Sequence, residues 1–221
     1  MTENFTSVLD YAVLKPENTL ADLEKAVEIC KCYKVGNLCV RPCDVSDAVR
    51  LLDNCGTSVS AVVAFPHGDS CSDTKTFEAK RAFEDGAVEV DMVLNIGKLK
   101  SGEDEFVQAD IAAVVKVARL HRGIVKVIFE TSLLTTDEIC RAVRISIAAG
   151  AAFVKTSTGF SSGGATLDVV RLMVKESAGR IKVKASGGIR SRFAAEEFLA
   201  AGAERLGVGN VETLLNDEEK A

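Results

Sequence analysis

Residues 151–159 of this 221-residue chain read AAFVKTSTG, an apolar run that ends in a turn rich in Ser, Thr and Gly. Residues 181–188 have the same form and read IKVKASGG. Short apolar runs bounded by such turns are typical of strands that are buried on both faces of a parallel sheet. Because each run carries a lysine near its end, we expect two lysines at the carboxyl ends of successive buried strands.

A lysine in such a run can have a structural or a chemical role. Burying an unpaired ammonium is strongly unfavourable, so a strand-end lysine commonly reaches solvent or pairs with a carboxylate. The other escape is a lowered pKa, and a neutral lysine is a nucleophile for carbonyl groups. The occurrence of Lys155 and Lys184 in two similar runs favours a Schiff-base enzyme, although the structural role remains open for either lysine alone.

Eight apolar segments alternate with segments of helical periodicity along the chain. The expected strands are residues 7–14, 36–40, 59–65, 88–96, 125–130, 152–155, 181–185 and 205–208. The expected helices are residues 20–33, 45–52, 74–85, 105–120, 137–149, 167–177, 193–200 and 211–215. Eight β-then-α units predict an α/β fold, a single (β/α)8 TIM barrel over residues 1–221, with an open doubly wound sheet as the alternative.

Active sites of such barrels lie at the carboxyl ends of the strands, where Lys155 and Lys184 are expected. Side chains alternate between the two faces of a strand, so Asp91 and Asn95 share the inner face of segment 88–96. Asp91 can be an ion-pair partner or a proton carrier, and beside two inward lysines it can be both. Lys182 is expected at the opposite end of its strand, in a solvated structural role.

Composition excludes several classes of function. The formal net charge is −5 and no basic stripe is present, so nucleic acid is not an expected partner. Only two histidines occur, so no metal site is expected. The seven cysteines form no CxxC pair, which indicates reduced thiols in the cytoplasm. We expect neither a secretory signal in residues 1–10 nor a membrane span.

The strand-end residues resemble those of the class I deoxyribose-phosphate aldolases. The matching segments are LKP at 14–16, CVRP at 39–42, FPHG at 65–68, EVDMVLNIG at 89–97, KVIFET at 126–131, residues 153–159 and residues 184–190. The resemblance implies that Lys155 forms the Schiff base, that Lys184 perturbs its pKa, and that Asp91 takes part in proton relay. It also implies reversible cleavage of 2-deoxy-D-ribose 5-phosphate to D-glyceraldehyde 3-phosphate and acetaldehyde, without a cofactor, by a homo-oligomer (dimer or tetramer).

A glycine-lined phosphate site is expected beside these groups. The resemblance implies that Gly159, Gly187 and Gly188 line it. Gly207 and Gly209 are added because the loops after the last two strands of a barrel often present backbone N–H groups to a phosphate.

Two departures from the family pattern bear on this site. The family usually has a glycine, then Thr or Ala, then two serines after its last strand, where this chain has Gly207-Val208-Gly209-Asn210. It usually has Asp-His-Thr near the first strand, where this chain has Asp10-Tyr11-Ala12. The lost hydroxyl donors predict weaker phosphate binding.

Three alternatives therefore stay open. A related Schiff-base aldolase could take a different or unphosphorylated aldehyde substrate. A catalytically idle barrel could serve in binding or regulation, although the retention of Lys155, Lys184 and Asp91 argues against it. Cys39, at the end of the second strand, is either a functional thiol or a packed small hydrophobe.

Overall fold

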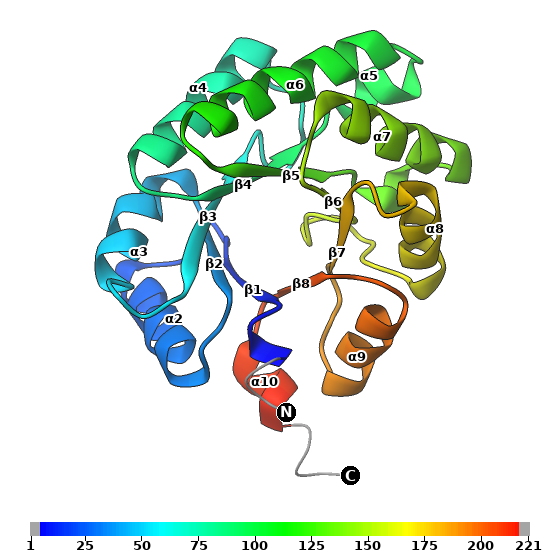
Figure 1. Cartoon of the computed structure of the whole chain (residues 1–221). Helices are drawn as coiled ribbons and strands as arrows, with labels where there is room; N and C mark the ends of the chain where they lie inside the picture. Colours follow the sequence, from blue (N-terminus) through cyan, green and yellow to red (C-terminus); the bar gives the residue numbers. More distant parts are fainter. Residues whose placement is uncertain (1–4, 217–221) are drawn as a thin grey trace.

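The computed structural model describes residues 5–216, in which eight parallel strands form a closed barrel in chain order (Figure 1). The strands are β1 Leu9–Val13, β2 Asn37–Val40, β3 Ser58–Val63, β4 Glu89–Val93, β5 Ile124–Ile128, β6 Phe153–Lys155, β7 Lys182–Ser186 and β8 Arg205–Val208. β1 pairs with β8 and closes the ring. The predicted (β/α)8 barrel is confirmed. The single domain was predicted over residues 1–221, of which residues 1–4 and 217–221 lie outside the described part.

Helices surround the barrel on its outer side (Figure 1). They are α2 Leu20–Tyr33, α3 Val45–Leu51, α4 Ser72–Glu84, α5 Ile96–Lys100, α6 Asp104–Leu120, α7 Thr136–Ala149, α8 Leu167–Ser177, α9 Arg192–Ala200 and α10 Val211–Asn216, with 3-10 turns η1 Pro42–Asp44 and η2 Thr131–Leu133. Capping boxes begin α2 at Thr19 and α7 at Thr135, because each threonine exchanges hydrogen bonds with an acidic residue three positions later. Over residues 5–216, no helix has the length and apolar character needed to cross a membrane.

The prediction of a strand over residues 88–96 is wrong at its C-terminal end. β4 ends at Val93, and Asn95 caps the short helix α5 by accepting a hydrogen bond from the Lys98 backbone N–H at 3.0 Å. Asn is a favoured N-cap because its side chain satisfies a backbone donor that has no partner within the helix. Asn95 therefore does not share the strand face that carries Asp91.

Hydrophobic side chains pack in two clusters. The large one joins strand residues such as Val90 and Met92 to the helices around the barrel. The small one consists of Leu14, Cys39 and Val62, with Ala12 and Phe65 packed against them, at the carboxyl ends of β1 to β3. The alternation within β4 places Glu89 and Asp91 on the face opposite to Val90 and Met92, which is the interior of the barrel.

Candidate active site

Charged side chains from six strands meet inside the barrel. They are Asp10 of β1, Glu89 and Asp91 of β4, Lys126 of β5, Lys155 of β6, Lys184 of β7 and Arg205 of β8. All are buried except Arg205, which is partly exposed. Parallel register makes this possible, because it sets Asp91 beside Lys126 and Lys155 beside Lys184 on neighbouring strands. We call these seven residues the ionic cluster.

Lys126 lies at the centre of the ionic cluster. Its Nζ is 2.9 Å from Asp10 Oδ2, 2.9 Å from Asp91 Oδ1 and 2.5 Å from Glu89 Oε2. Arg205 completes this part by pairing Nη1 with Asp10 Oδ1 at 2.6 Å and Nη2 with Glu89 Oε1 at 3.0 Å. A buried charge is tolerated only when it is paired and hydrogen-bonded, and each carboxylate here has at least two cationic partners.

The two lysines singled out from the sequence share one oxygen of Asp91. Lys155 Nζ and Lys184 Nζ each donate to Asp91 Oδ2 at 2.8 Å, and Lys184 also donates to Asp10 Oδ2. The structure therefore brings Lys155, Lys184 and Asp91, the three residues singled out from the sequence, into direct contact.

The surroundings shift the pKa values of the two lysines in opposite directions. Burial lowers the pKa of Lys155, and the neighbouring charge of Lys184 lowers it further, against the opposing effect of Asp91. Burial also disfavours a charged Lys184, but its carboxylate partners Asp10 and Asp91 outweigh burial and raise its pKa. The same balance raises the pKa of Lys126 well above its ordinary value. Lys155 is thus the lysine of the cluster that is most readily neutral.

A count of charges in the ionic cluster leads to the same assignment. Its three carboxylates face four basic side chains. Burial disfavours a charged Asp91, yet the charges of Lys126, Lys155 and Lys184 hold the pKa of this carboxyl well below its usual range. Lys126, Lys184 and Arg205 suffice to balance the three carboxylates, so the cluster is electrically neutral when the Lys155 amine is uncharged.

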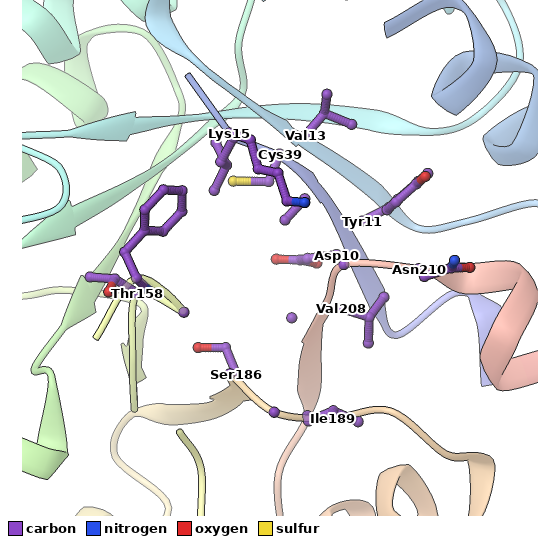
Figure 2. A pocket seen from close by; sticks show the side chains of 18 of the residues that line it. Asp10, Tyr11, Val13, Lys15, Cys39, Thr158, Ser186, Ile189, Val208 and Asn210 are labelled. Atoms are coloured by element: carbon purple, nitrogen blue, oxygen red, sulfur yellow. Dashed lines mark hydrogen bonds between the residues drawn. The ribbon is translucent and has the colours of Figure 1, made fainter. Parts of the chain in front are cut away.

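A cavity of 960 Å³ opens above the ionic cluster at the carboxyl ends of the strands. Lys155 and Lys184 lie at its floor together with Asp10. Figure 2 shows the Asp10 carboxylate directed into the cavity, while the Tyr11 hydroxyl points away from its centre. The Thr158 hydroxyl donates to Glu130 Oε2, and the Ser186 hydroxyl donates to the Ser157 carbonyl at 2.6 Å. The apolar side chains Ala12, Leu14 and Cys39 line it as well. The site therefore has a nucleophilic amine beneath an open, mixed polar and apolar chamber.

All five glycines predicted for phosphate binding line this cavity, but they differ in what they face. A side chain at Gly159, Gly188 or Gly209 would meet open space, which leaves room for a ligand to approach the backbone closely. Gly187 is crowded by Gly164 and Ser157 at the base of its loop. Among the described residues, the backbone N–H groups of Gly188 and Gly209 have no hydrogen-bond partner. The N–H groups of Gly159 and Gly187 likewise have no partner there, and those of Gly188 and Gly209 differ in lying on the neighbouring loops that follow β7 and β8.

Gly207, which lines the cavity as predicted for a phosphate-binding glycine, also contacts the ionic cluster. A β-carbon there would come within 2.7 Å of Ser186 Cβ and 3.3 Å of Lys184 Cε. The missing side chain gives Lys184 the space to reach Asp10, so Gly207 makes room for the ionic cluster. In the altered loop after β8, Val208 is in the main core with 1% of its surface exposed. Asn210 Oδ1 accepts a hydrogen bond from the Thr213 N–H at the start of α10.

Sequence reasoning missed Lys126 and Asp10 as members of the site. The strand IVKVI contains the signal for Lys126, because a lysine in the middle of an apolar strand is buried and, like Lys155, needs a partner for its charge or a lowered pKa. Asp10 lies in the apolar first strand and carries a similar signal. Neither pattern alone tells that the two side chains meet across the barrel.

Glu130 was also missed. It follows β5 with the left-handed backbone angle φ = 55° and is buried. Its Oε2 accepts hydrogen bonds from both the backbone N–H and the hydroxyl of Thr158, and Thr158 Oγ1 accepts from the Phe160 N–H at 3.0 Å. Glu130 therefore fastens the loop that follows Lys155 and carries Gly159. A left-handed turn of this kind leaves little trace in a sequence when the residue is not glycine.

Two minor expectations can be compared with the structure. Lys182 is exposed and its Nζ is 3.4 Å from Glu204 Oε2, as expected for a solvated structural lysine. Cys39 is 1% exposed and packs in the small hydrophobic cluster, and burial raises the pKa of its thiol. Both features favour the packed-hydrophobe interpretation of Cys39.

Comparisons with known proteins agree with this geometry. The sequence model of the DeoC/LacD family of aldolases matches residues 6–207. Deoxyribose-phosphate aldolases of Bacillus cytotoxicus and Bacillus cereus are 46% identical to the chain over 219 residues, covering 99% of this chain and 98% of each relative.

Solved structures show the same likeness. The tetrameric deoxyribose phosphate aldolase from Aeropyrum pernix has a TM-score of 0.93 and 29% identity, covering 100% of this chain and 93% of its own. The aldolase QR15 has a TM-score of 0.93 and 36% identity, covering 98% and 96% of the two chains. The resemblance noted in the sequence is confirmed, and the chain belongs to the DeoC/LacD family of aldolases.

Proposed function

We propose that this protein is a Schiff-base aldolase that reversibly cleaves 2-deoxy-D-ribose 5-phosphate to D-glyceraldehyde 3-phosphate and acetaldehyde. One observation carries the mechanism: Lys155 lies at the floor of the cavity, and burial together with the charge of Lys184 lowers its pKa. The names of the curated relatives support the substrate.

The reaction begins when the neutral amine of Lys155 attacks the C1 aldehyde of the open-chain sugar. Loss of water from the adduct gives an iminium, which withdraws electrons from C2. Removal of the proton from the C3 hydroxyl then breaks the C2–C3 bond, and the bonding pair forms an enamine while D-glyceraldehyde 3-phosphate leaves. Protonation of the enamine at C2, followed by hydrolysis, returns acetaldehyde and free Lys155.

Lys184 and Asp91, which lie beside Lys155 inside the barrel, assist these steps. Lys184 stays protonated because Asp10 and Asp91 surround it, so its charge keeps Lys155 neutral and nucleophilic. Asp91 accepts a hydrogen bond from the reacting nitrogen and is the nearest carboxylate to it. We assign to Asp91 the transfer of protons to and from that nitrogen, directly or through a water molecule.

The test is a steady-state comparison of two sugars. We expect a higher kcat/KM for 2-deoxyribose 5-phosphate than for 2-deoxyribose, because Gly188 and Gly209 offer unpaired backbone donors to a phosphate. Product analysis should give acetaldehyde and glyceraldehyde 3-phosphate in equal amounts. A chain that cleaves neither sugar would contradict the proposal and favour the idle barrel.

A second candidate is a related Schiff-base aldolase that takes an unphosphorylated aldehyde. The observation in its favour is the loop after β8, where Val208 and Gly209 supply no side-chain hydroxyl. It predicts that free deoxyribose, or another unphosphorylated aldehyde adduct, has the higher kcat/KM. The same assay therefore decides between the two candidates.

We further propose that the protein works in the cytoplasm as a homo-oligomer. The relative from Aeropyrum pernix is a tetramer, and large apolar side chains such as Phe77 and Phe193 are 68% and 72% exposed on the outer helices. Light scattering of the purified chain should give the mass of a dimer or tetramer. A monomer at micromolar concentration would contradict this assembly.

A further inference from the structure

Lys15 is held in a fixed position at the rim of the cavity. It lies in the loop between β1 and α2, where its backbone N–H donates to Asn18 Oδ1 at 2.9 Å. Its carbonyl accepts a hydrogen bond from Arg41 Nη1 at 3.3 Å, and the same nitrogen reaches the next carbonyl, that of Pro16, at 3.1 Å. Arg41 is itself fixed by two hydrogen bonds to Asp44, at 2.7 and 3.2 Å. The loop is therefore pinned on both sides.

The side chain that this loop presents has no partner in the protein. Within residues 5–216 the Lys15 ammonium makes no hydrogen bond or ion pair, although the residue lines the cavity. Figure 2 shows the side chain reaching from the end of β1 over the cavity. A loop that is fixed by hydrogen bonds and carries an unpaired charge at the rim of an open cavity is preorganised for an anionic ligand.

The position of Lys15 around the ring matches the glycine donors. β7, β8 and β1 are consecutive neighbours in the barrel, so the loops that follow them lie side by side on the rim. The first two of these loops carry Gly188 and Gly209, with their unpaired backbone N–H groups. The segment Val208–Asn210 contains no basic residue, so a cation for an anion bound there has to come from a neighbouring loop.

We infer that Lys15 binds the phosphate group of the sugar substrate. Its ammonium forms a charge-assisted hydrogen bond from one side while the glycine N–H groups bind from the other. This role rests on the proposed function, because it assumes that the ligand is a sugar phosphate. It also explains how a site without hydroxyl side chains after β8 can still select a phosphorylated substrate. Arg190 lies two residues after Gly188 and lines the same cavity, so the test leaves Arg190 in place and changes Lys15 alone.

The test measures kcat and KM for 2-deoxyribose 5-phosphate and for 2-deoxyribose in the wild type and in Lys15→Met. Loss of one hydrogen bond to a charged group lowers kcat/KM for the phosphorylated sugar by about 10- to 100-fold. The loss is expected in KM, with kcat little changed, and cleavage of free deoxyribose should stay the same. Lys15→Arg keeps a cation on the loop and should restore most of the preference. Lys116→Met removes an exposed lysine from α6, outside the cavity, and controls for net charge.

Inorganic phosphate gives a second readout that does not depend on turnover of the phosphorylated sugar. It should inhibit cleavage of free deoxyribose competitively, and its inhibition constant should rise about 10-fold in Lys15→Met. If the wild type prefers the phosphorylated sugar, and Lys15→Met changes neither this preference nor the phosphate inhibition constant, the role of Lys15 is contradicted while the proposed function stands. A wild type without that preference contradicts the proposed function and this inference together.

Discussion

Replacing Lys184 by methionine tests how the ionic cluster activates Lys155. The change keeps an unbranched side chain, one atom shorter, but removes a cation that shares the oxygen Asp91 Oδ2 with Lys155. Since each nitrogen is 2.8 Å from that oxygen, the two nitrogens lie within twice that distance of each other. Two unit charges about 5 Å apart repel by about 3 kcal/mol at an effective dielectric constant of about 20. Without this repulsion, the neutral fraction of Lys155 at pH 7 falls by about 100-fold.

The charge count predicts the same direction. In Lys184→Met the three carboxylates of the ionic cluster keep Lys126 and Arg205, so a protonated Lys155 becomes the third balancing cation. We therefore expect the neutral amine of Lys155 to form only at higher pH in this variant, and activity to recover in part as the pH is raised.

The assay is a full pH profile of kcat for cleavage of deoxyribose 5-phosphate, with circular dichroism to measure the folded fraction. Lys182→Met is the matched control, because it removes a lysine from the exposed end of the same strand and should leave the profile unchanged. An activity loss in Lys184→Met that is equal at all pH values would refute the electrostatic reasoning, and normal activity at pH 7 would refute the role of Lys184.

Three further predictions concern the rest of the site. Asp91→Asn should lower the free energy of unfolding by about 3–5 kcal/mol near pH 7, because it removes a buried carboxylate from three lysines. Since the pKa of Asp91 is lower in the folded than in the unfolded state, this stability is present above about pH 4 and is lost as the pH falls. Urea titrations from pH 3 to 7 should therefore show that the free energy of unfolding falls less steeply with acid in the variant than in the wild type. An equal dependence on pH in both proteins would contradict the ion pairing. Glu130→Ala should lower kcat about 10-fold by freeing Thr158, an effect of the size of one hydrogen bond, whereas Glu130→Gln keeps an acceptor oxygen and should retain most of the rate; equal losses in both would contradict this positioning role. Gly209→Ser adds a hydroxyl in open space and should lower KM for the phosphorylated sugar by about 2- to 10-fold, so an unchanged KM would place the phosphate elsewhere.

Much of this fold is readable in the chain because local signals and tertiary structure agree. Each strand is a short apolar run, and helices such as Leu20–Tyr33 begin after an N-cap residue that marks the start of the helix in the sequence. The prediction failed where a local bond overrides the pattern, as at Asn95, whose side chain begins a helix within an otherwise strand-like segment.

The candidate site could be predicted only in part. Strand parity places Asp91 on the inner face of the barrel, because side-chain direction alternates along each strand, and the positions of Lys155 and Lys184 near the ends of their strands place these lysines at its carboxyl end. Parity does not give the distance across the barrel, so the contacts of Lys126 with Asp10 and Asp91 required the structure. It also does not show which way a glycine faces, and Gly207 proved to make room for Lys184.

The central claim is that Lys155 is the nucleophile, and trapping its Schiff base tests this most directly. The protein is incubated with acetaldehyde and sodium borohydride, and intact mass spectrometry is followed by peptide mapping. We predict one added two-carbon unit per chain, located on Lys155, and no labelling in Lys155→Met. The lowered pKa of Lys155 and the raised pKa of Lys184 predict this selectivity. A label on Lys184 would contradict the assignment of the two lysines, and a chain that takes up no label would contradict the Schiff-base mechanism.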